Sequence, residues 1–385
     1  MNDKYTFLDL IGFRIHENRP KVPESLKYTI WMEKHKDFSF VQLWFRSRGC
    51  RYTHFHGGCT MCDYWISDPI SPDLLVDYVK EGLSKLNFDP TILLLNSSGS
   101  VFDDWEIPKE SRLKIFNVLS ELKYARFIFE THPLTISGSK IEECKNILKN
   151  NEIEIEIGLE SANPLILTYC INKASTINDV TNAIRILKKY GVKSYVNILI
   201  GAPFLTLSEV VDDAIYSINW AFEQGADRCV LFPVNIKPWT LVYWLKQQGM
   251  YIQPSLWTLT EILSKIRPNL LQRIGISWHK TRPQYHPEYK ILNQGATTCS
   301  KCHDIVISLL DRYAVSQNRQ NIVEELKGLR CDCKLRWFDE YHKTSKLSCL
   351  RKRIKANYLI IAEKILGEDW LIEHGDKLES NLSLS

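Results

Sequence analysis

Cys50, Cys59 and Cys62 form the group of side chains best suited to chemistry in this sequence. They follow directly after an apolar, strand-like run at 40–45, so they lie in the loop where that strand ends. Three thiolates can bind three irons of a [4Fe–4S] cluster and leave the fourth iron without a protein ligand. An iron with an open coordination position binds small molecules, so the spacing Cys-x8-Cys-x2-Cys predicts a reactive cluster.

The residues around these cysteines fit a tightly folded loop. Gly49, Gly57 and Gly58 accept backbone angles that are forbidden to other residues. A zinc knuckle is the alternative interpretation, with His54 or His56 as the fourth ligand. A knuckle gives no reason for the group to follow the first strand of an α/β alternation, so the sequence favours the cluster.

A second cysteine group lies near the other end of the chain. Cys299 and Cys302 form one close pair, and Cys331 and Cys333 form another, with a helical pattern between them. Four thiolates match the tetrahedral site that structural zinc prefers. An auxiliary iron–sulfur cluster, zinc with His303 in place of one thiolate, and cysteines without a metal stay open as alternatives.

The elements that must position these groups alternate regularly between strand and helix. Apolar runs rich in β-formers predict strands at 40–45, 91–95, 125–129, 152–157, 193–200 and 228–232. Helical patterns lie at 73–86, 110–123, 139–150, 177–190, 207–224, 257–265, 304–314 and 352–365. The fold class is therefore α/β: a partial (β/α)6 barrel, open on one side, followed by a small α-rich, cysteine-containing C-terminal region.

The same pattern divides the chain into three parts. We expect an N-terminal extension over 1–37, the barrel core over 38–240 and the C-terminal region with its metal site over 241–385. In such barrels the reactive groups gather at the carboxyl ends of the strands. The first cysteine loop follows a strand directly, so it lies on that face.

The bulk composition is that of an ordinary globular protein with a net charge of +4. This small charge permits nucleic-acid binding but does not argue for it. No apolar stretch approaches the roughly 20 residues that span a bilayer, and no signal peptide is evident. Eleven cysteines in such a chain indicate metal or redox chemistry, so we expect a reducing, cytoplasmic environment.

The string GGCTMCDYW resembles the Elongator-type branch of the radical S-adenosylmethionine (SAM) superfamily, and most of all its archaeosine-forming enzymes, which act on a modified tRNA base. The similarity extends to LLLNSSGSVFDD, EIGLESAN, NILIGAP, CSKCHDIV and CDCKLRW. It implies that SAM chelates the open iron and that reductive cleavage yields a 5′-deoxyadenosyl radical. It also implies a one-electron donor of the flavodoxin or ferredoxin kind.

The resemblance further implies which residues hold SAM. The turn after the second predicted strand supplies backbone acceptors for the SAM amino group, which assigns that role to Ser98, Gly99 and Ser100. The family's GGE triplet is absent there, so an ordinary turn is the alternative. Lys173 is the implied partner of the SAM carboxylate, unless it is simply an exposed lysine.

Other implied contacts come from the ends of later strands. Asn197 is placed near ribose, while Ile198 resembles part of the strand that contacts adenine. Glu130 and Glu160 end or follow strands and should face the mouth of the barrel, where they could bind ribose or a cationic substrate group; solvated carboxylates are the alternative. Further residues that could border SAM or substrate are Met61, Tyr64, His132, Glu156, Phe232 and Asn235.

Several functions stay open on the sequence alone. The leading hypothesis is a radical SAM enzyme acting on a tRNA-linked modified base or a related small molecule, with substrate delivery by a partner protein possible. Natural-product biosynthesis and 3-amino-3-carboxypropyl transfer from SAM are enzymatic alternatives. A non-catalytic, zinc-binding, RNA-associated protein is the rival from another class; the segment 279–290, with Lys280, Arg282 and Tyr285, could touch an anionic partner.

Overall fold

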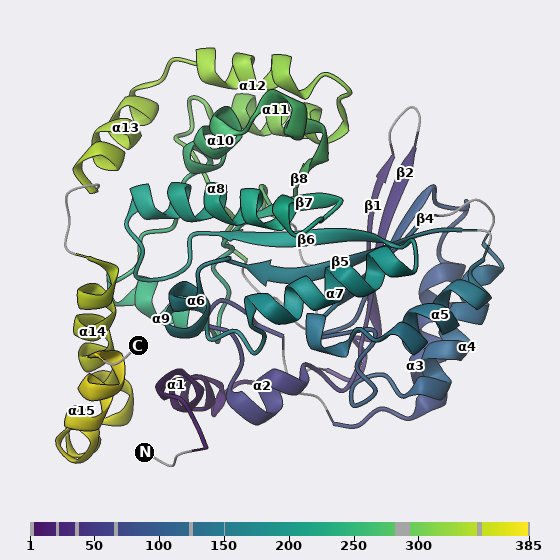
Figure 1. The fold of residues 1–385 in the computed structure, drawn as a ribbon, viewed down its shortest axis with the longest axis horizontal. Helices are drawn as coiled ribbons and strands as arrows, with labels where there is room; N and C mark the ends of the chain where they lie inside the picture. Colours follow the sequence, from purple (N-terminus) through teal and green to yellow (C-terminus); the bar gives the residue numbers. More distant parts are fainter. Residues whose placement is uncertain are drawn as a thin grey trace.

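An eight-stranded sheet forms the centre of the computed structural model (Figure 1). The structure describes residues 4–20, 23–34, 38–64, 68–122, 126–149, 151–281, 293–344 and 349–383. The predicted contact residues Arg282 and Tyr285 lie outside these ranges. The strands lie side by side in the order in which they occur along the chain.

The first pair of strands is antiparallel and every later pair is parallel. The strands are β1 (Tyr28–Lys34), β2 (Ser39–Phe45), β3 (Ile92–Asn96), β4 (Arg126–Thr131), β5 (Glu152–Glu160), β6 (Lys193–Ile200), β7 (Arg228–Pro233) and β8 (Ile274–Ile276). The six predicted strands are β2–β7, so the partial (β/α)6 barrel is confirmed.

Each edge of the sheet carries one strand that the sequence interpretation left out. β1 precedes the cysteine loop's own strand, so β2 is the first parallel strand but not the first strand of the sheet. β8 adds a seventh parallel strand beside β7. Because β1 lies within 1–37 and pairs along its whole length with β2, that stretch contributes to the central sheet. The division into 1–37, 38–240 and 241–385 remains a prediction.

Helices cover the outer face of the sheet, with α7 lying in front of β5 and β6 in Figure 1. The barrel helices are α2 (Arg51–His56), α3 (Pro72–Ser84), α4 (Lys109–Ser120), α5 (Gly138–Ile147), α6 (Pro164–Ile166), α7 (Ile177–Lys189) and α8 (Leu207–Glu223). α8 begins with a capping box, in which Thr206 and Glu209 satisfy each other's backbone N–H groups.

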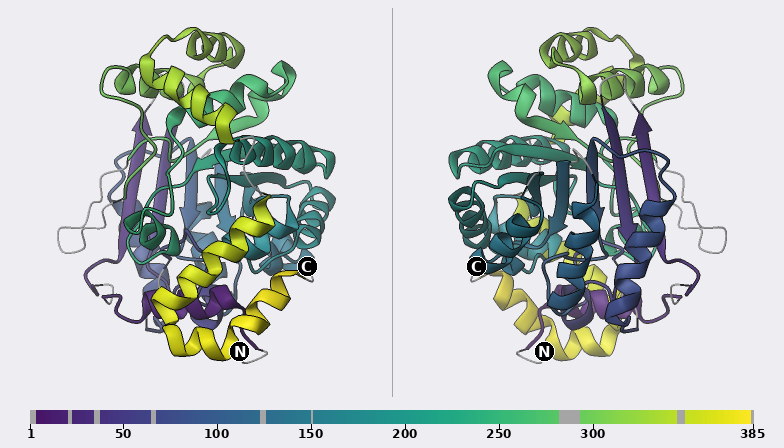
Figure 2. Two further views of the ribbon diagram at one scale, coloured as in Figure 1. Left: turned by 90° about the vertical axis from the view of Figure 1, so that its left-hand side faces the viewer. Right: turned by 90° about the vertical axis from the view of Figure 1, so that its right-hand side faces the viewer.

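The helices of the C-terminal part are α9 (Leu241–Gln247), α10 (Leu256–Lys265), α11 (His303–Val315), α12 (Arg319–Gly328), α13 (Asp332–Thr344), α14 (Leu350–Ile361) and α15 (Glu368–Ser383). Most of them form two groups, α10–α13 above the sheet and α14 and α15 at its left in Figure 1; Figure 2 shows the same groups from the sides. Both α10 and α13 pack on α8, so α8 lies between the barrel and the second cysteine group. None of the helices in the described ranges is both long and apolar enough to cross a membrane.

A helix near the N-terminus, α1 (Phe7–His16), packs beside α2 and α9. The sequence interpretation missed α1, although Thr6 and Asp9 form a capping box at its start. Its apolar face joins a second core, in which Phe7 and Tyr358 of α14 place their ring centroids 4.5 Å apart. The two ends of the chain therefore meet against the barrel.

Candidate functional site: a cavity beside the first cysteine loop

The three cysteines of the first group line one cavity of about 230 Å³ at the carboxyl ends of the strands. Cys50 is the residue that caps α2, and Cys59 and Cys62 follow in the next loop. A positive φ of 70° at Gly57 ends α2 after six residues and turns the chain back toward the cavity. The sequence thus places its thiols on the face of the barrel where the alternation predicts them.

The separation of these three thiols determines which kind of metal centre they can bind. Among the described residues, only the C-terminal cysteines form a group of three or more possible ligand atoms within 4.8 Å of one another. The first group is therefore too wide to surround a single ion. A [4Fe–4S] cluster inserts irons and sulfides between its thiolates, and three thiolates around a cavity fit that requirement.

The two histidines of the zinc-knuckle alternative are engaged elsewhere. His54 is exposed, and its ring lies 5.3 Å from that of Trp105. His56 places Nδ1 3.4 Å from the buried carboxylate of Asp9. Among the described residues neither histidine belongs to a compact ligand set with the cysteines, so the geometry favours the cluster over the knuckle.

Contacts from distant parts of the chain hold the cysteine loop in place. The side-chain amide of Asn172 donates to Asp9 and to the carbonyl oxygen of Gly58, each at 3.0 Å. Thr60 donates through its backbone N–H to Ile171 at 2.9 Å. Both Asp9 and Asn172 are almost fully buried, so these bonds are shielded from water and fix the loop to α1 and to the segment after α6.

The turn predicted to contact the SAM amino group lies directly beneath the first cysteine. A Cβ atom added to Gly99 would lie 2.9 Å from Cα of Cys50 and 2.5 Å from Oε2 of Glu106. Only glycine fits at this position. The predicted small residue is therefore required by close packing between the turn and the cysteine loop.

Glu106, which the sequence interpretation did not single out, shapes this turn. Its carboxylate accepts the backbone N–H groups of Gly99 at 2.9 Å and Ser100 at 2.5 Å, and the hydroxyl of Ser47. Because a trans peptide points its C=O away from its N–H, the carbonyls of Ser98 and Gly99 face away from Glu106. Burial raises the pKa of Glu106 to about 7, although these hydrogen bonds oppose the shift.

Glu160 and Lys173, both predicted site residues, form a shielded ion pair at the cavity. Lys173 Nζ lies 3.0 Å from Glu160 Oε1, and the two side chains are only 9% and 13% exposed. Glu160 has a positive φ of 68° at a register shift in β5, which turns its side chain toward the lysine. Burial lowers the pKa of Lys173, but the Glu160 carboxylate together with Cys59 and Cys62 more than compensates, so the net pKa is raised and the ammonium is charged.

A third carboxylate, Glu130, lies deeper among polar groups. Asn96 donates to it at 3.1 Å, and the Tyr64 hydroxyl lies 3.5 Å from both carboxylate oxygens. Burial raises its pKa, opposed by the hydrogen bond from Asn96. A second shielded ion pair joins Lys237, which lines the cavity, to Asp63 at 2.7 Å; Asp63 follows Cys62 in the sequence.

The structure brings most of the predicted site residues together. Those that line the cavity are Met61, Tyr64, Gly99, Glu130, His132, Glu156, Glu160, Lys173, Asn197, Phe232 and Asn235. Ser98, Ser100 and Ile198 do not line it: the two serines are buried, and Ile198 points to the opposite face of β6 from Asn197. Any contact from these three to a ligand would come from their backbone.

The sequence interpretation missed Asp63, Glu106, Lys237 and Trp278 near this site. Lys237 and Asp63 are far apart in sequence, so no local spacing connects them. Glu106 lies outside any strand end, in the turn before α4. Trp278 follows the short strand β8, which the alternation did not include. A complete strand count would have pointed to Trp278 as a residue beyond a strand end.

The second cysteine group has a different geometry. Its sulfur atoms are 3.4 Å apart for Cys299–Cys331 and Cys302–Cys333, 3.5 Å for Cys331–Cys333 and 3.6 Å for Cys299–Cys302. A tetrahedron of thiolates around zinc, with Zn–S bonds of about 2.3 Å, has edges of about 3.8 Å. The indole N–H of Trp257 also donates to Cys333 Sγ at 3.1 Å. The group therefore fits one tetrahedral ion.

Comparison with known proteins agrees with this geometry. The family model described as the radical SAM superfamily matches residues 45–216, which contain the cysteine loop and strands β3–β6. This match assigns residues 45–216 to the radical SAM superfamily. The chain is accordingly a superfamily enzyme, for which a [4Fe–4S] cluster and SAM are the implied cofactors and a one-electron donor is required.

The radical SAM chain is also similar to individual relatives. It is 29% identical over 306 residues to archaeosine synthase subunit beta of Methanosarcina acetivorans, covering 76% of this chain and 82% of that protein. It is 28% identical over 358 residues to the uncharacterized protein MJ0550 of Methanocaldococcus jannaschii, covering 88% and 93%. A solved structure of Elp3 from Methanocaldococcus infernus superposes with a TM-score of 0.45 at 17% identity, over 69% and 63% of the two chains.

Proposed function

We propose that this protein binds a [4Fe–4S] cluster through Cys50, Cys59 and Cys62 and cleaves SAM reductively in the adjoining cavity. When bound, the reduced cluster supplies one electron to the SAM sulfonium, and the resulting 5′-deoxyadenosyl radical acts on a tRNA-linked modified base or a related small molecule. The single observation that carries the proposal is the position of three widely spaced thiols around one cavity at the strand ends.

The residues beside the thiols suit the polar groups of SAM. The carbonyls of Ser98 and Gly99, turned away from Glu106, are acceptors for its ammonium group. Lys173 is charged and shielded, so it can pair with the SAM carboxylate by exchanging part of its contact with Glu160. Asn197 lines the same cavity with an unpaired side-chain oxygen, which suits a ribose hydroxyl.

Burial also gives this cavity its chemical protection. Burial raises the pKa of Cys59 to about 12, so iron binding must displace the thiol proton. Lys173 and Lys237 are the cations that favour the thiolate forms of Cys59 and Cys62. Apolar side chains such as Phe232 and Leu199 complete the wall and limit water near a radical.

We further propose that the second cysteine group holds one structural zinc ion. The four sulfur atoms leave no position for a further ligand, which is the property of structural rather than catalytic zinc sites. Because α13 and α10 pack on α8, the ion would tie the C-terminal helices to the barrel. An auxiliary cubane would need its thiolates further apart than these are.

The tRNA-related substrate rests on the similarity to archaeosine synthase subunit beta. The word "subunit" in that relative's name supports a partner protein, which would deliver the substrate to this chain. Small net charge agrees with a division of labour in which the partner supplies most of the RNA contact. Both points are proposals for this chain.

Anaerobic turnover tests the function directly. The protein is reconstituted with iron and sulfide, reduced with dithionite and incubated with SAM, and the products are separated by chromatography. We expect 5′-deoxyadenosine together with methionine. Methylthioadenosine would instead identify aminocarboxypropyl transfer, and a colourless protein that retains only zinc would contradict the cluster and support the non-catalytic rival.

A further inference from the structure

A patch of aromatic and basic side chains lies on the solvent side of the first cysteine loop. It consists of Arg48, Arg51, His54, Phe55 and Trp105, and we call it the α2 patch. Arg51, His54 and Phe55 are exposed, and the large apolar side chain of Phe55 is 44% exposed. None of the five residues is among those that line the cavity, so the proposed cleavage of SAM gives them no role.

One short helix separates the α2 patch from the cavity. Tyr52 and Thr53 of α2 line the cavity next to Cys50, whereas Phe55 is exposed to solvent. The backbone N–H of His54 donates to the carbonyl oxygen of Cys50 at 3.1 Å, so a single hydrogen bond joins an exposed residue to the one that carries the first thiol. A protein seated on the α2 patch is therefore separated from this thiol only by the thickness of α2.

The rings of the α2 patch contact one another instead of the interior. The ring centroids are 5.7 Å apart for Phe55 and Trp105, 4.6 Å for His54 and Phe55, and 5.3 Å for His54 and Trp105. Within the described part of the chain, neither Phe55 nor Trp105 belongs to the two hydrophobic cores. Exposed apolar groups framed by polar ones mark protein interaction sites, and Trp and Arg are enriched among the residues that dominate binding there.

The α2 patch also carries positive charge. The guanidinium carbon of Arg48 lies 4.1 Å from the ring centroid of Trp105, and Arg51 is 61% exposed, with the carboxylate of Asp103 at 3.9 Å. The exposed carboxylate of Asp104 already pairs with two basic side chains outside the patch. Exposed charges of one sign steer partners of the opposite sign, so the α2 patch favours an acidic protein.

We propose that the α2 patch is the docking surface for the one-electron donor, and that this donor is a small acidic carrier protein. The reduced carrier gives one electron to the oxidised cluster across α2, and no bond forms or breaks in this step. Electron-transfer partners meet through small, transient interfaces, which a patch of this size suits. The inference rests on the proposed function for the presence of the cluster, and it adds where the reductant binds and which charge it carries.

Reduction by a protein donor tests this surface. The full-length, reconstituted protein is mixed anaerobically with a fully reduced flavodoxin, an acidic one-electron carrier whose flavin changes colour when it loses one electron. We expect the rate of electron transfer to fall as salt is added, because salt screens exposed charges. A flavodoxin that neither binds nor reduces the wild-type protein would overturn the inference.

Two substitutions in the α2 patch identify what the donor contacts. Arg51→Glu should slow electron transfer from flavodoxin about tenfold at low salt, because it reverses a charge that steers the donor. Phe55→Ala should weaken flavodoxin binding about fivefold, because it removes an apolar contact. Arg336→Glu, at an exposed arginine of α13, is the matched control and should change neither value; α13 lies above the sheet in Figure 1, whereas α2 lies below it. Equal effects of Arg51→Glu and Arg336→Glu would refute the docking role of the α2 patch.

Dithionite separates docking from damage to the cysteine loop. A small reductant in excess needs no protein surface. Iron content and the yield of 5′-deoxyadenosine with dithionite should therefore be the same in the wild type, Arg51→Glu and Phe55→Ala. Loss of iron or of product in either variant would show that these side chains support the loop itself and would overturn the docking role.

Calorimetric binding of flavodoxin, measured without SAM, separates this inference from the proposed function. A protein that cleaves SAM with dithionite, but whose Arg51→Glu variant accepts electrons from flavodoxin as fast as the wild type, retains the proposed function and loses the docking surface. A protein that binds flavodoxin through the α2 patch but forms no 5′-deoxyadenosine keeps the surface and loses the radical chemistry.

Discussion

The two cysteine groups of this chain use the same side chain in opposite ways. Cys50, Cys59 and Cys62 spread around a cavity, in a loop that turns back after a six-residue helix. The C-terminal four place all their sulfur atoms within 4.8 Å of one another, beside the starts of α11 and α13. The first arrangement leaves room for a ligand on the metal, and the second fills the coordination sphere with protein.

The surroundings of the two cysteine groups also differ: one is charged and the other is apolar. The first group is bordered by the charged pairs of Glu160 with Lys173 and Asp63 with Lys237. The second is packed against apolar core residues and the indole of Trp257. The number of thiols alone thus does not separate a reactive centre from a structural one; the separation of the sulfur atoms and the charge around them do.

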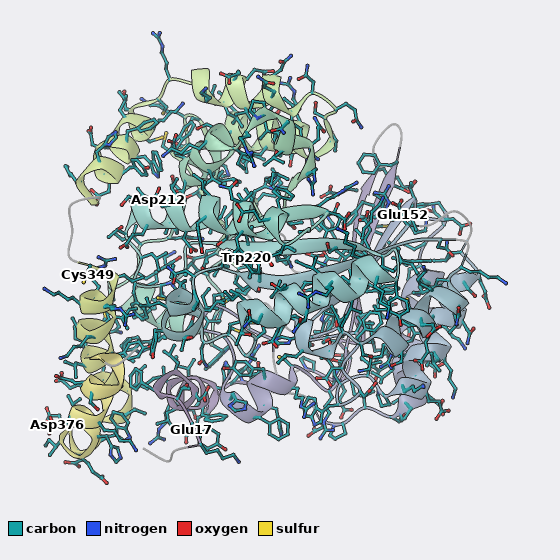
Figure 3. The ribbon with its side chains drawn as sticks, in the orientation of Figure 1. Glu17, Glu152, Asp212, Trp220, Cys349 and Asp376 are labelled. Atoms are coloured by element: carbon teal, nitrogen blue, oxygen red, sulfur yellow. The ribbon has the colours of Figure 1, made fainter. Side chains whose placement is uncertain are left out.

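The largest expected effect comes from breaking the first group. Cys50→Ala should abolish SAM cleavage while the protein remains folded, because one iron loses its ligand and the cavity loses little packing. Iron content and 5′-deoxyadenosine formation are the measurements. Cys349→Ala, at an exposed cysteine at the start of α14 (Figure 3), is the control and should leave both unchanged. If Cys349→Ala lost as much iron and activity as Cys50→Ala, the special role of the first cysteine group would be contradicted.

Breaking the second group should act on stability. Cys302→Ala should remove the zinc and cost about 4 kcal/mol or more in unfolding free energy, as loss of a structural metal does. Metal analysis, thermal unfolding and hydrogen exchange across α11–α13 report on this. Iron bound at the first group should remain. If iron is lost together with zinc from a folded protein, the second site is a redox centre and not a structural one.

Two glycine substitutions, one in each region, should have a smaller effect than the cysteine substitutions. A Cβ atom at Gly158 would lie 2.6 Å from Glu160 Oε1 and 2.7 Å from Lys173 Nζ, whereas one at Gly328 would have open space. Gly158→Ala should therefore displace the ion pair and weaken SAM binding roughly tenfold, as small misplacements in a site do. Gly328→Ala should leave SAM affinity unchanged. Equal SAM affinity in both variants would exclude Lys173 from the site.

A pH effect concerns α8, the helix that contacts both regions. Burial raises the pKa of Asp213 to about 7, while a hydrogen bond from Ser161 opposes the shift. The folded protein then holds a proton that the unfolded chain releases near pH 4, so stability should fall as pH rises from about 4 to about 7.

Asp213→Asn should remove this part of the pH dependence, which amounts to a few kcal/mol at about 1.4 kcal/mol per pKa unit. Thermal unfolding at pH 5 and pH 8 measures it. Asp212→Asn, on the exposed side of α8 (Figure 3), should behave like the wild type. A single transition that shifts as a whole would show that the barrel and the C-terminal helices unfold together; two transitions would show that α8 does not couple them.

Local sequence signals predicted the parts of the fold that depend on local patterns. Apolar runs predicted β2–β7, and the helical pattern at 207–224 predicted α8. β1 was missed because it is an edge strand, and the half-buried alternation of edge strands is weak. β8 has only three residues, which is too short for a periodic signal.

The residues of the candidate site also fall into those that the sequence indicated and those that it did not. Cysteine spacing indicated the thiols, strand ends indicated Glu130 and Glu160, and the resemblance to radical SAM enzymes implied Lys173. All of them line the cavity. Residues that meet only in the folded chain, such as Asp63 and Lys237, could not be predicted from the sequence. Glu106 acts on a turn by accepting backbone N–H groups, which leaves no pattern of side-chain types.

The contact between α1 and the cysteine loop has a practical consequence. A Cβ atom on Gly12 would lie 2.4 Å from the carbonyl oxygen of Gly57, so helix and loop touch backbone to backbone. The first helix therefore supports the back of the loop that carries Cys59. An affinity tag or truncation that dislodges α1 would uncover the back of this loop, so purification handles belong away from the first helix.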